Sequence, residues 1–258
     1  MRQIIRNVKI IGTGAYVPEK IYTNKYLETI IPTNDEWIQA NLGIKERHIA
    51  SENETTSDLA AKAGLNAIRD AGLSVDNIDL IIVATATPDR KAPSTAAIVQ
   101  HKIKAFNAAA FDIAAVCSGF LFAMSIGTQY IASGVYNNVL VIGADTFSRI
   151  VDWTRRDAVF FGDGSGAAVL TSANVIEGFL AYRLYTDSSH DHLGFTVPAG
   201  GSEIPIDAGV LEQGLQFFQM DGKAVFNSAT QALPRAIYQV LEDCLLYTSP
   251  SPRDPKTS

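Results

Sequence analysis

Residues 111–120, FDIAAVCSGF, mark the point where a strand pattern turns into a helix pattern. The apolar residues before Cys117 favour a buried strand, and Phe120 and Met124 after it lie at helical spacing. The pattern places Cys117 on the first turn of a helix, where unpaired backbone N–H groups and the helix dipole stabilise a thiolate. Such a cysteine is a candidate nucleophile with a lowered pKa, although a small thiol buried in the core explains the same local sequence.

The segments around this stretch alternate between strand and helix patterns. Strands are expected over residues 8–12, 78–85, 109–116, 139–144 and 166–171, and helices over residues 55–71, 94–104 and 118–133. This alternation predicts βαβ units and a mostly parallel sheet with helices on both faces. After Ser172 the pattern restarts, with a strand expected over 176–185, a loop-rich stretch over 187–216 and a helix over 222–241. That last helix is left without strands to cover it.

Composition limits the class of protein. The chain has 258 residues, of which 47% are hydrophobic and 19% charged, and its net charge is −6. These values suit one large or two smaller globular domains. The acidic balance, without any Lys/Arg-rich run, argues against a nucleic-acid partner. Two cysteines do not form a disulfide framework, so a reducing, cytoplasmic location is expected.

An uncharged run needs a check for membrane insertion. Residues 113–144 contain no Asp, Glu, Lys or Arg, and that length allows a spanning helix. Polar residues and glycines interrupt the run at 118–119, 127–129, 133–134 and 137–138. The better prediction is a buried strand, a buried helix, a turn and another buried strand, with no membrane contact.

The last residues, 244–258, read CLLYTSPSPRDPKTS and do not continue the preceding helix, because their three prolines prevent it. The string resembles the translation of a sequencing-library adapter, and we interpret it as a non-native tail. A disordered Pro/Ser-rich tail is the alternative. On the first interpretation, Cys117 is the one native cysteine and the natural protein is longer than this chain.

Two further motifs accompany Cys117. They are GIKERHI at residues 43–49 and FGDGSGAA at residues 161–168. Together with the AVCSGF turn they resemble the ketoacyl-acyl-carrier-protein synthase III family of the thiolase superfamily, over residues 1–243. The resemblance implies an α/β, thiolase-like fold with a duplicated βαβαβαββ core. Its first half, residues 1–172, would be complete and carry the nucleophile, and its second half, residues 173–243, would be truncated.

The resemblance also implies an acyltransferase reaction. Cys117 would accept an acyl group from acyl-CoA or acyl carrier protein (ACP), since a thiolate is both a good nucleophile and a good leaving group. Decarboxylative Claisen condensation with malonyl-ACP would then give 3-oxoacyl-ACP, which initiates a fatty-acid chain. The family works as a homodimer without a permanently bound cofactor or a metal. Backbone N–H groups near Cys117 can hold the thioester oxyanion.

The family's condensation step needs a His and an Asn that lie beyond the helix ending near Asp243. None of this chain's histidines matches that motif, and we assign none of them a catalytic role: His48, His101, His190 and His192. The spacing of His190 and His192 suits a metal site, but a polar loop explains it more simply. We therefore expect this chain to lack the residues for full condensation.

Five other positions match residues that bind CoA or its pantetheine arm in the family. Trp37 fits the position that stacks on adenine, Thr33 and Arg156 fit other binding positions, and Gly222 and Phe226 fit the pantetheine tunnel. A half-buried aromatic is the simpler interpretation of Trp37, and a solvated surface charge is the simpler one of Arg156.

Three positions depart from the family pattern. Asn41 replaces an Arg that contacts the nucleotide, Asp157 replaces a Gly and would repel phosphate, and Lys223 adds a positive charge. These departures suggest a carrier protein or a non-standard CoA ester as acyl donor. Ala92, where a bulky residue often shapes the acyl pocket, leaves room for a secondary-metabolite condensing enzyme of polyketide or alkylketone type. A non-catalytic partner subunit of a condensing heterodimer is a further alternative, which the presence of Cys117 disfavours.

Overall fold

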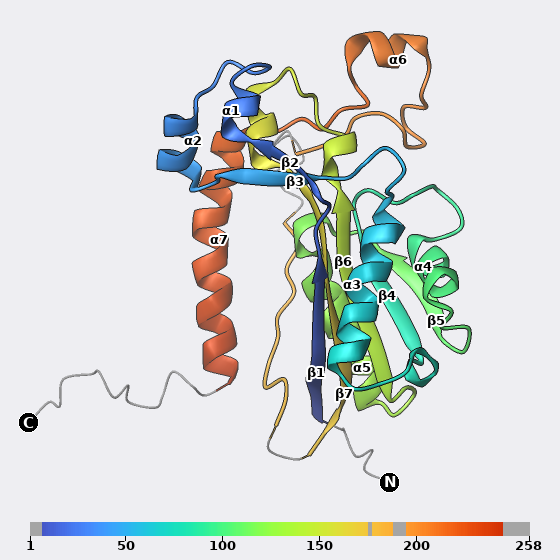
Figure 1. The fold of residues 1–258 in the computed structure, drawn as a ribbon. Helices are drawn as coiled ribbons and strands as arrows, with labels where there is room; N and C mark the ends of the chain where they lie inside the picture. The colour runs from blue at the N-terminus through green and yellow to red at the C-terminus, as the bar shows by residue number, and fades with distance from the viewer. Residues whose placement is uncertain (1–6, 175–176, 188–194, 245–258) are drawn as a thin grey trace, which may run out of the picture. The chain divides into compact units, whose positions relative to one another are not determined.

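The computed structural model describes residues 7–174, 177–187 and 195–244. The chain divides into two compact units, Met1–Gly178 with Val197–Phe218, and Phe179–Thr196 with Gln219–Ser258. The first unit contains Cys117 and the α/β core (Figure 1). The predicted halves, with a boundary at residue 172, stay a prediction.

The first unit contains strands, α-helices and short 3-10 helices in the order of the chain. Its strands are β1 (Asn7–Tyr16), β2 (Lys20–Thr23), β3 (Glu46–Ile49), β4 (Leu80–Ala84), β5 (Ala109–Ile113), β6 (Asn138–Thr146) and β7 (Asp163–Ala173). Its α-helices are α1 (Asn24–Leu27), α2 (Asp35–Leu42), α3 (Thr56–Asp70), α4 (Thr95–Ile103), α5 (Gly119–Ala132) and α6 (Ala208–Gln213). The 3-10 helices are η1 (Val75–Asn77), η2 (Val116–Ser118), η3 (Phe147–Arg149) and η4 (Arg156–Phe160).

The central sheet has the strand order β1-β7-β6-β4-β5. Strand β4 pairs in parallel with β5 and with β6, whereas β7 is antiparallel to both of its neighbours. All strands except β7 therefore run in one direction, which confirms the predicted mostly parallel sheet. Along the chain the core elements follow the order β1, α3, β4, α4, β5, α5, β6, β7, the βαβαβαββ arrangement expected of the first half.

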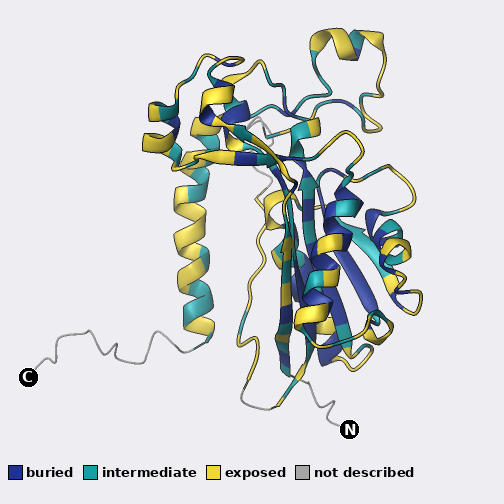
Figure 2. Ribbon diagram, viewed as in Figure 1, coloured by how far each residue is buried: buried dark blue, intermediate teal, exposed yellow. Residues whose placement is uncertain are grey.

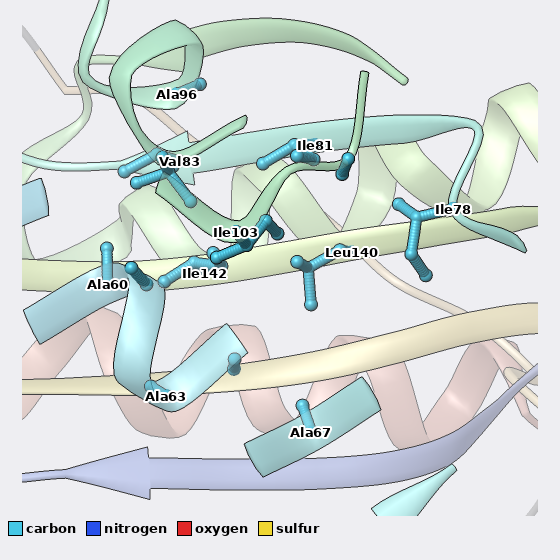
Figure 3. Packing of buried hydrophobic residues seen from close by; sticks show 14 of the residues in the cluster. Ala60, Ala63, Ala67, Ile78, Ile81, Val83, Ala96, Ile103, Leu140 and Ile142 are labelled. Atoms are coloured by element: carbon cyan, nitrogen blue, oxygen red, sulfur yellow. The ribbon is translucent and has the colours of Figure 1, made fainter. Parts of the chain in front are cut away.

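Helices cover both faces of the sheet, as the alternation predicted. In β4, Ile81 and Val83 belong to a buried cluster with α3 and α4, while Leu80 and Ile82 belong to a cluster with α5. Figure 3 shows the first of these clusters, in which alanines of α3 and Ile103 of α4 pack on the same face of the sheet. All five residues of β4 are buried, so its uninterrupted apolar run matches a strand covered on both faces (Figure 2).

The first strand is longer than predicted. Glycines at positions 12 and 14 suggested that the strand ends there, but β1 continues to Tyr16. These glycines allow α3 to approach β1 closely. A Cβ on Gly14 would lie 2.3 Å from the carbonyl oxygen of Ala63 and 2.4 Å from the backbone nitrogen of Ala67. The requirement for glycine therefore comes from helix–strand packing, which a local pattern does not reveal.

A third, smaller core lies apart from the sheet clusters. It brings together residues of α1, α2 and η4, including Leu27, Ile38 and Val159, with Trp37 and Trp153 packed against it. Strands β2 and β3, which form an antiparallel pair, flank it, and Tyr22 of β2 packs against it. This cluster positions the candidate nucleotide-binding residues.

The second unit differs from its sequence prediction in one element. The strand expected over 176–185 is wrong for the described residues 177–185, which form neither strand nor helix, and residue 176 lies outside the described residues. The side chain of Arg183 pairs with Asp243, and the Tyr185 hydroxyl donates to Gln239 Oε1 at 2.6 Å. Side chains of a helix therefore hold this segment, and no strand among the described residues pairs with it, as a β-ladder requires.

Two helices complete the description. Helix α6, within the stretch predicted to be loop, begins where the Asp207 side chain accepts a hydrogen bond from the Val210 N–H at 2.8 Å. Helix α7 (Gly222–Asp243) confirms the predicted long helix and contains no buried residue (Figure 2). Phe226 and Leu233 are 67% and 62% exposed, which confirms that its apolar side chains are uncovered.

The uncharged run 113–144 forms the end of β5, then η2, α5 and most of β6, as predicted. Among the described residues no helix combines the length and the apolar character that crossing a bilayer requires. The proposed non-native tail begins at Cys244, the last described residue, and residues 245–258 lie outside the described part.

Candidate active site

Cys117 lies on a strained turn between β5 and α5. It belongs to the 3-10 helix η2, and α5 begins two residues later, so Cys117 precedes the helix rather than lying on its first turn. Val116 has a φ of 44°, a left-handed conformation that is rare for a β-branched residue. This conformation ends the strand earlier than predicted, at Ile113, and turns the chain so that Cys117 is exposed. The interpretation of Cys117 as a buried core thiol is therefore wrong.

The predicted low pKa of Cys117 is also wrong. Partial burial of the thiol raises its pKa, and the carboxylate of Asp145 raises it further. A hydrogen bond from the backbone N–H of Cys117 itself favours the thiolate but only partly offsets these effects. The helix terminus alone led to the prediction of a low pKa, whereas desolvation and the nearby carboxylate both raise it.

Asp145 is a residue that the sequence reasoning missed. It lies near the end of β6, and its Oδ1 accepts hydrogen bonds from the Ala86 N–H at 2.8 Å, the Thr85 hydroxyl at 3.1 Å and the Thr87 hydroxyl at 2.8 Å. Burial raises the pKa of this carboxyl, and the hydrogen bonds oppose that rise. The sequence did contain a signal for Asp145, because its carboxylate follows the buried run of a parallel strand. Binding sites gather at the carboxyl ends of such strands.

Close packing fixes the start of α5 over the ends of two strands. A Cβ on Gly119 would lie 3.1 Å from the Cβ of Ala84 in β4. A Cβ on Gly143 of β6 would lie 3.2 Å from the ring of Phe120. The turn that carries Cys117 is thus anchored against β4 and β6 by contacts that leave little space for larger side chains.

The structure brings two of the predicted CoA-site residues together. The guanidinium carbon of Arg156 lies 4.2 Å from the centroid of a Trp37 ring, a cation–π contact. Trp37 is half-buried on α2, and Arg156 is exposed at the start of η4. Thr33, just before α2, has a buried Oγ1 with no hydrogen-bond partner among the described residues. Such an unsatisfied buried hydroxyl is uncommon in proteins.

Two of the departures from the family pattern have clear partners. Asp157 pairs with Arg155, whose Nη2 lies 3.0 Å from its Oδ2, so the carboxylate expected to repel phosphate is held by a neighbouring guanidinium. Asn41 donates a hydrogen bond to the Trp37 carbonyl at 2.8 Å and so lies against its own helix. With these partners, Asp157 and Asn41 disfavour CoA as the acyl donor less than the sequence suggested.

The remaining candidates lie on other elements of the chain. Gly222 and Phe226 lie at the start of α7 in the second unit, and their role in the pantetheine tunnel stays a prediction. His48 Nδ1 lies 2.5 Å from the Pro18 carbonyl, and the His101 ring lies 6.1 Å from Phe106. His190 and His192 lie outside the described residues. Within the described ranges, no cluster of three or more metal-binding side chains occurs.

The FGDG motif leads into strand β7, which begins at Asp163. Asp163 is buried and accepts hydrogen bonds from the Ala50 N–H at 2.7 Å, the Ser148 N–H at 2.8 Å and the Ser148 hydroxyl at 2.6 Å. Its carboxylate thus ties the start of β7 to two other segments. This arrangement gives the motif a structural role.

A sheet of this strand order, covered by helices on both faces and carrying a cysteine turn before α5, defines a thiolase-like protein. The family model for 3-oxoacyl-(acyl-carrier-protein) synthase III matches residues 111–188. A curated relative, the beta-ketoacyl-(acyl-carrier-protein) synthase III of Caldanaerobacter subterraneus, is 47% identical over 236 residues, which cover 91% of this chain and 71% of the relative. The chain belongs to the 3-oxoacyl-(acyl-carrier-protein) synthase III family.

Solved structures agree with this assignment. The crystal structure of the synthase III from Aquifex aeolicus matches with a TM-score of 0.81 and 42% identity, covering 92% of this chain and 72% of that one. The priming β-ketosynthase from the R1128 polyketide pathway matches with a TM-score of 0.78 and 29% identity, covering 95% of this chain and 72% of that one. Fatty-acid and polyketide enzymes therefore share this fold.

Proposed function

We propose that this chain carries the acyl-transfer chemistry of a β-ketoacyl-ACP synthase III, which initiates fatty-acid chains. The Cys117 thiolate attacks the carbonyl of an acyl-CoA or acyl-ACP thioester, and a bond forms between Sγ and the acyl carbon. The bond from that carbon to the donor sulfur breaks, and the donor leaves as a thiolate that takes up a proton. The observation that carries this proposal is the exposed Cys117 on a strained turn that packing fixes between β5 and α5.

The second step in the family is a decarboxylative condensation. Malonyl-ACP loses carbon dioxide, its carbanion attacks the acyl carbon, and the Cys117 thiolate leaves as 3-oxoacyl-ACP forms. We propose no residue of this chain as the His or Asn for this step, because none of its histidines matches the family motif. No permanently bound cofactor is part of the proposal. Acyl-CoA and malonyl-ACP enter as substrates.

Trp37, Arg156 and Thr33 are proposed to hold the nucleotide end of CoA. The facing aromatic ring and guanidinium suit a planar base and a phosphate, and the unpartnered Thr33 hydroxyl adds a polar group. Gly222 and Phe226 are proposed to line the path of the pantetheine arm. Their sequence match to the family is the support for that role.

A homodimer in the cytoplasm completes the proposal. Strand β5 is an edge strand of the central sheet and is only partly buried, so its free edge can pair with a second copy. An exposed free thiol at Cys117 favours a reducing compartment.

The test is acylation of the intact chain by acetyl-CoA and by acetyl-ACP, followed by intact-mass spectrometry and peptide mapping. We expect one acetyl group on Cys117 from at least one donor. Cys117→Ala should abolish this labelling, and the matched variant Cys244→Ser, which removes the other cysteine, should retain it. Labelling that survives Cys117→Ala, or no labelling by either donor, refutes the proposal.

A further inference from the structure

Arg47 on β3 is the one buried basic side chain among the described residues, with 5% of its surface exposed. No ion pair of the described chain includes it. Its guanidinium instead donates to three neutral oxygens: the Tyr22 carbonyl at 3.2 Å, Asn24 Oδ1 at 2.8 Å and the Val159 carbonyl at 3.0 Å. Burying a guanidinium without a carboxylate is costly, which implies that these three contacts are needed together.

One branch of this network reaches η4. The Val159 carbonyl lies in η4, whose first residue is Arg156. Gly162, just after η4, allows the segment to approach β3 closely, since a Cβ there would lie 2.9 Å from the Cβ of Arg47. Arg47 thereby fixes the distance between η4 and the β2–β3 strand pair.

The other branch reaches both ends of α2 through Asn24. While Asn24 Oδ1 accepts from Arg47, its Nδ2 donates to Asp35 Oδ1 at 2.8 Å and to the Ile44 carbonyl at 2.7 Å. Asp35 is the first residue of α2, and Ile44 lies just past its end. Trp37 lies on the first turn of this helix.

The two branches therefore hold the two elements that present Trp37 and Arg156, whose ring and guanidinium face each other at 4.2 Å. We infer that Arg47 is a positioning residue that sets the spacing of Trp37 and Arg156 and so controls affinity for the nucleotide end of the acyl donor. The inference rests on the proposed function. Arg47 acts through α2 and η4 and touches neither the thioester nor Cys117 in the described contacts.

The test separates donors with and without a nucleotide. The rate of Cys117 acetylation is measured against the concentration of acetyl-CoA and, in parallel, of acetyl-N-acetylcysteamine, a thioester without a nucleotide. Arg47→Met keeps the volume and removes the donors, and Arg47→Lys keeps the charge but loses the planar fork of donors. The matched control is Arg69→Met, because Arg69 is exposed on α3.

For Arg47→Met we expect the half-saturating concentration of acetyl-CoA to rise about tenfold, because three hydrogen bonds that hold α2 and η4 are lost. The rate constant with acetyl-N-acetylcysteamine and the maximal rate with acetyl-CoA should stay close to wild type. The half-saturating concentration of acetyl-CoA for Arg47→Lys should lie between those of the wild type and Arg47→Met. Arg69→Met should match the wild type with both donors. A general loss of structure would instead lower the rate of Cys117 acetylation with both donors.

An unchanged half-saturating concentration of acetyl-CoA in a folded Arg47→Met variant overturns the inference. An equal loss of acetylation rate with both donors overturns it too. If Arg47→Met does not fold, Asn24→Ala cuts the α2 branch alone. It should raise the half-saturating concentration of acetyl-CoA selectively, and no change there overturns the inference too. A wild-type chain that acetyl-CoA does not acylate contradicts the proposed function, whereas saturable wild-type acylation with unaffected variants contradicts only the role of Arg47.

Discussion

Replacing Gly14 with Ala tests whether the packing of α3 on β1 requires glycine. The added Cβ would lie 2.3 Å from the Ala63 carbonyl oxygen and 2.4 Å from the Ala67 nitrogen, whereas real Cβ contacts stay above 3.0 Å. Both neighbours are backbone atoms of a 15-residue helix, so no side-chain rotation can relieve the contact. The helix itself must move away from the strand.

The cost follows from what that movement disturbs. Ala63 and Ala67 are fully buried in the cluster that α3 shares with the sheet, so lifting the helix opens this core. Overpacking usually costs about 1–3 kcal/mol, and a rigid backbone neighbour places this case at about 3 kcal/mol or more. For a unit of this size, that free energy corresponds to a fall in melting temperature of about 6–12 °C.

Thermal unfolding followed by far-ultraviolet circular dichroism measures the change. Gly166→Ala is the matched control, because it makes the same substitution on β7, which pairs with β1, and its Cβ meets nothing within 4 Å. We expect the control to change stability by less than about 0.5 kcal/mol. A Gly14→Ala variant that melts with the wild type, or a control that is equally destabilised, would show that the close approach of α3 to β1 is not limiting.

Three further predictions concern the site and the core. Asp145→Asn removes the carboxylate that raises the pKa of Cys117, so alkylation by iodoacetamide at neutral pH should become faster, and an unchanged pH–rate midpoint would contradict this. In the wild type, raising the pH increases the thiolate fraction, so alkylation of Cys117 should accelerate about tenfold per pH unit until the pH passes the raised pKa of the thiol, and a plateau below neutral pH would refute that raised pKa. Leu140→Ala in the fully buried part of β6 should lower the free energy of unfolding by about 2–5 kcal/mol in denaturant titrations, and a loss under about 1 kcal/mol would show a loosely packed core.

The sequence predicts elements whose patterns reflect burial. The apolar run of β4 matched a strand covered on both faces, and the helix predicted over residues 55–71 agrees with α3 to within one residue at each end. These signals are local, because hydrophobic periodicity and caps depend on a few consecutive residues. The family motifs add the position of Cys117.

Features that depend on long-range contacts were not predictable in this way. The raised pKa of Cys117 arises from burial and from Asp145, which is 28 positions later in the sequence. The left-handed Val116 contradicts local preference and is maintained by the surrounding packing. The pairing of Arg155 with Asp157 also reversed an electrostatic argument that treated each charge alone.

The raised pKa of Cys117 is consistent with thioester exchange. In such an exchange the attacking and leaving groups are both thiols, and a nucleophile with an ordinary or raised pKa is intrinsically stronger as a thiolate than one with a depressed pKa. A mostly protonated resting thiol also reacts slowly with oxidants, which matters for a cysteine that is exposed. Backbone N–H groups at the start of a helix can stabilise the oxyanion that develops on the thioester during attack. The protonation state of Cys117 and the helix terminus thus serve two separate steps, nucleophilic attack and charge stabilisation, and changing Asp145 should alter the first without altering the second.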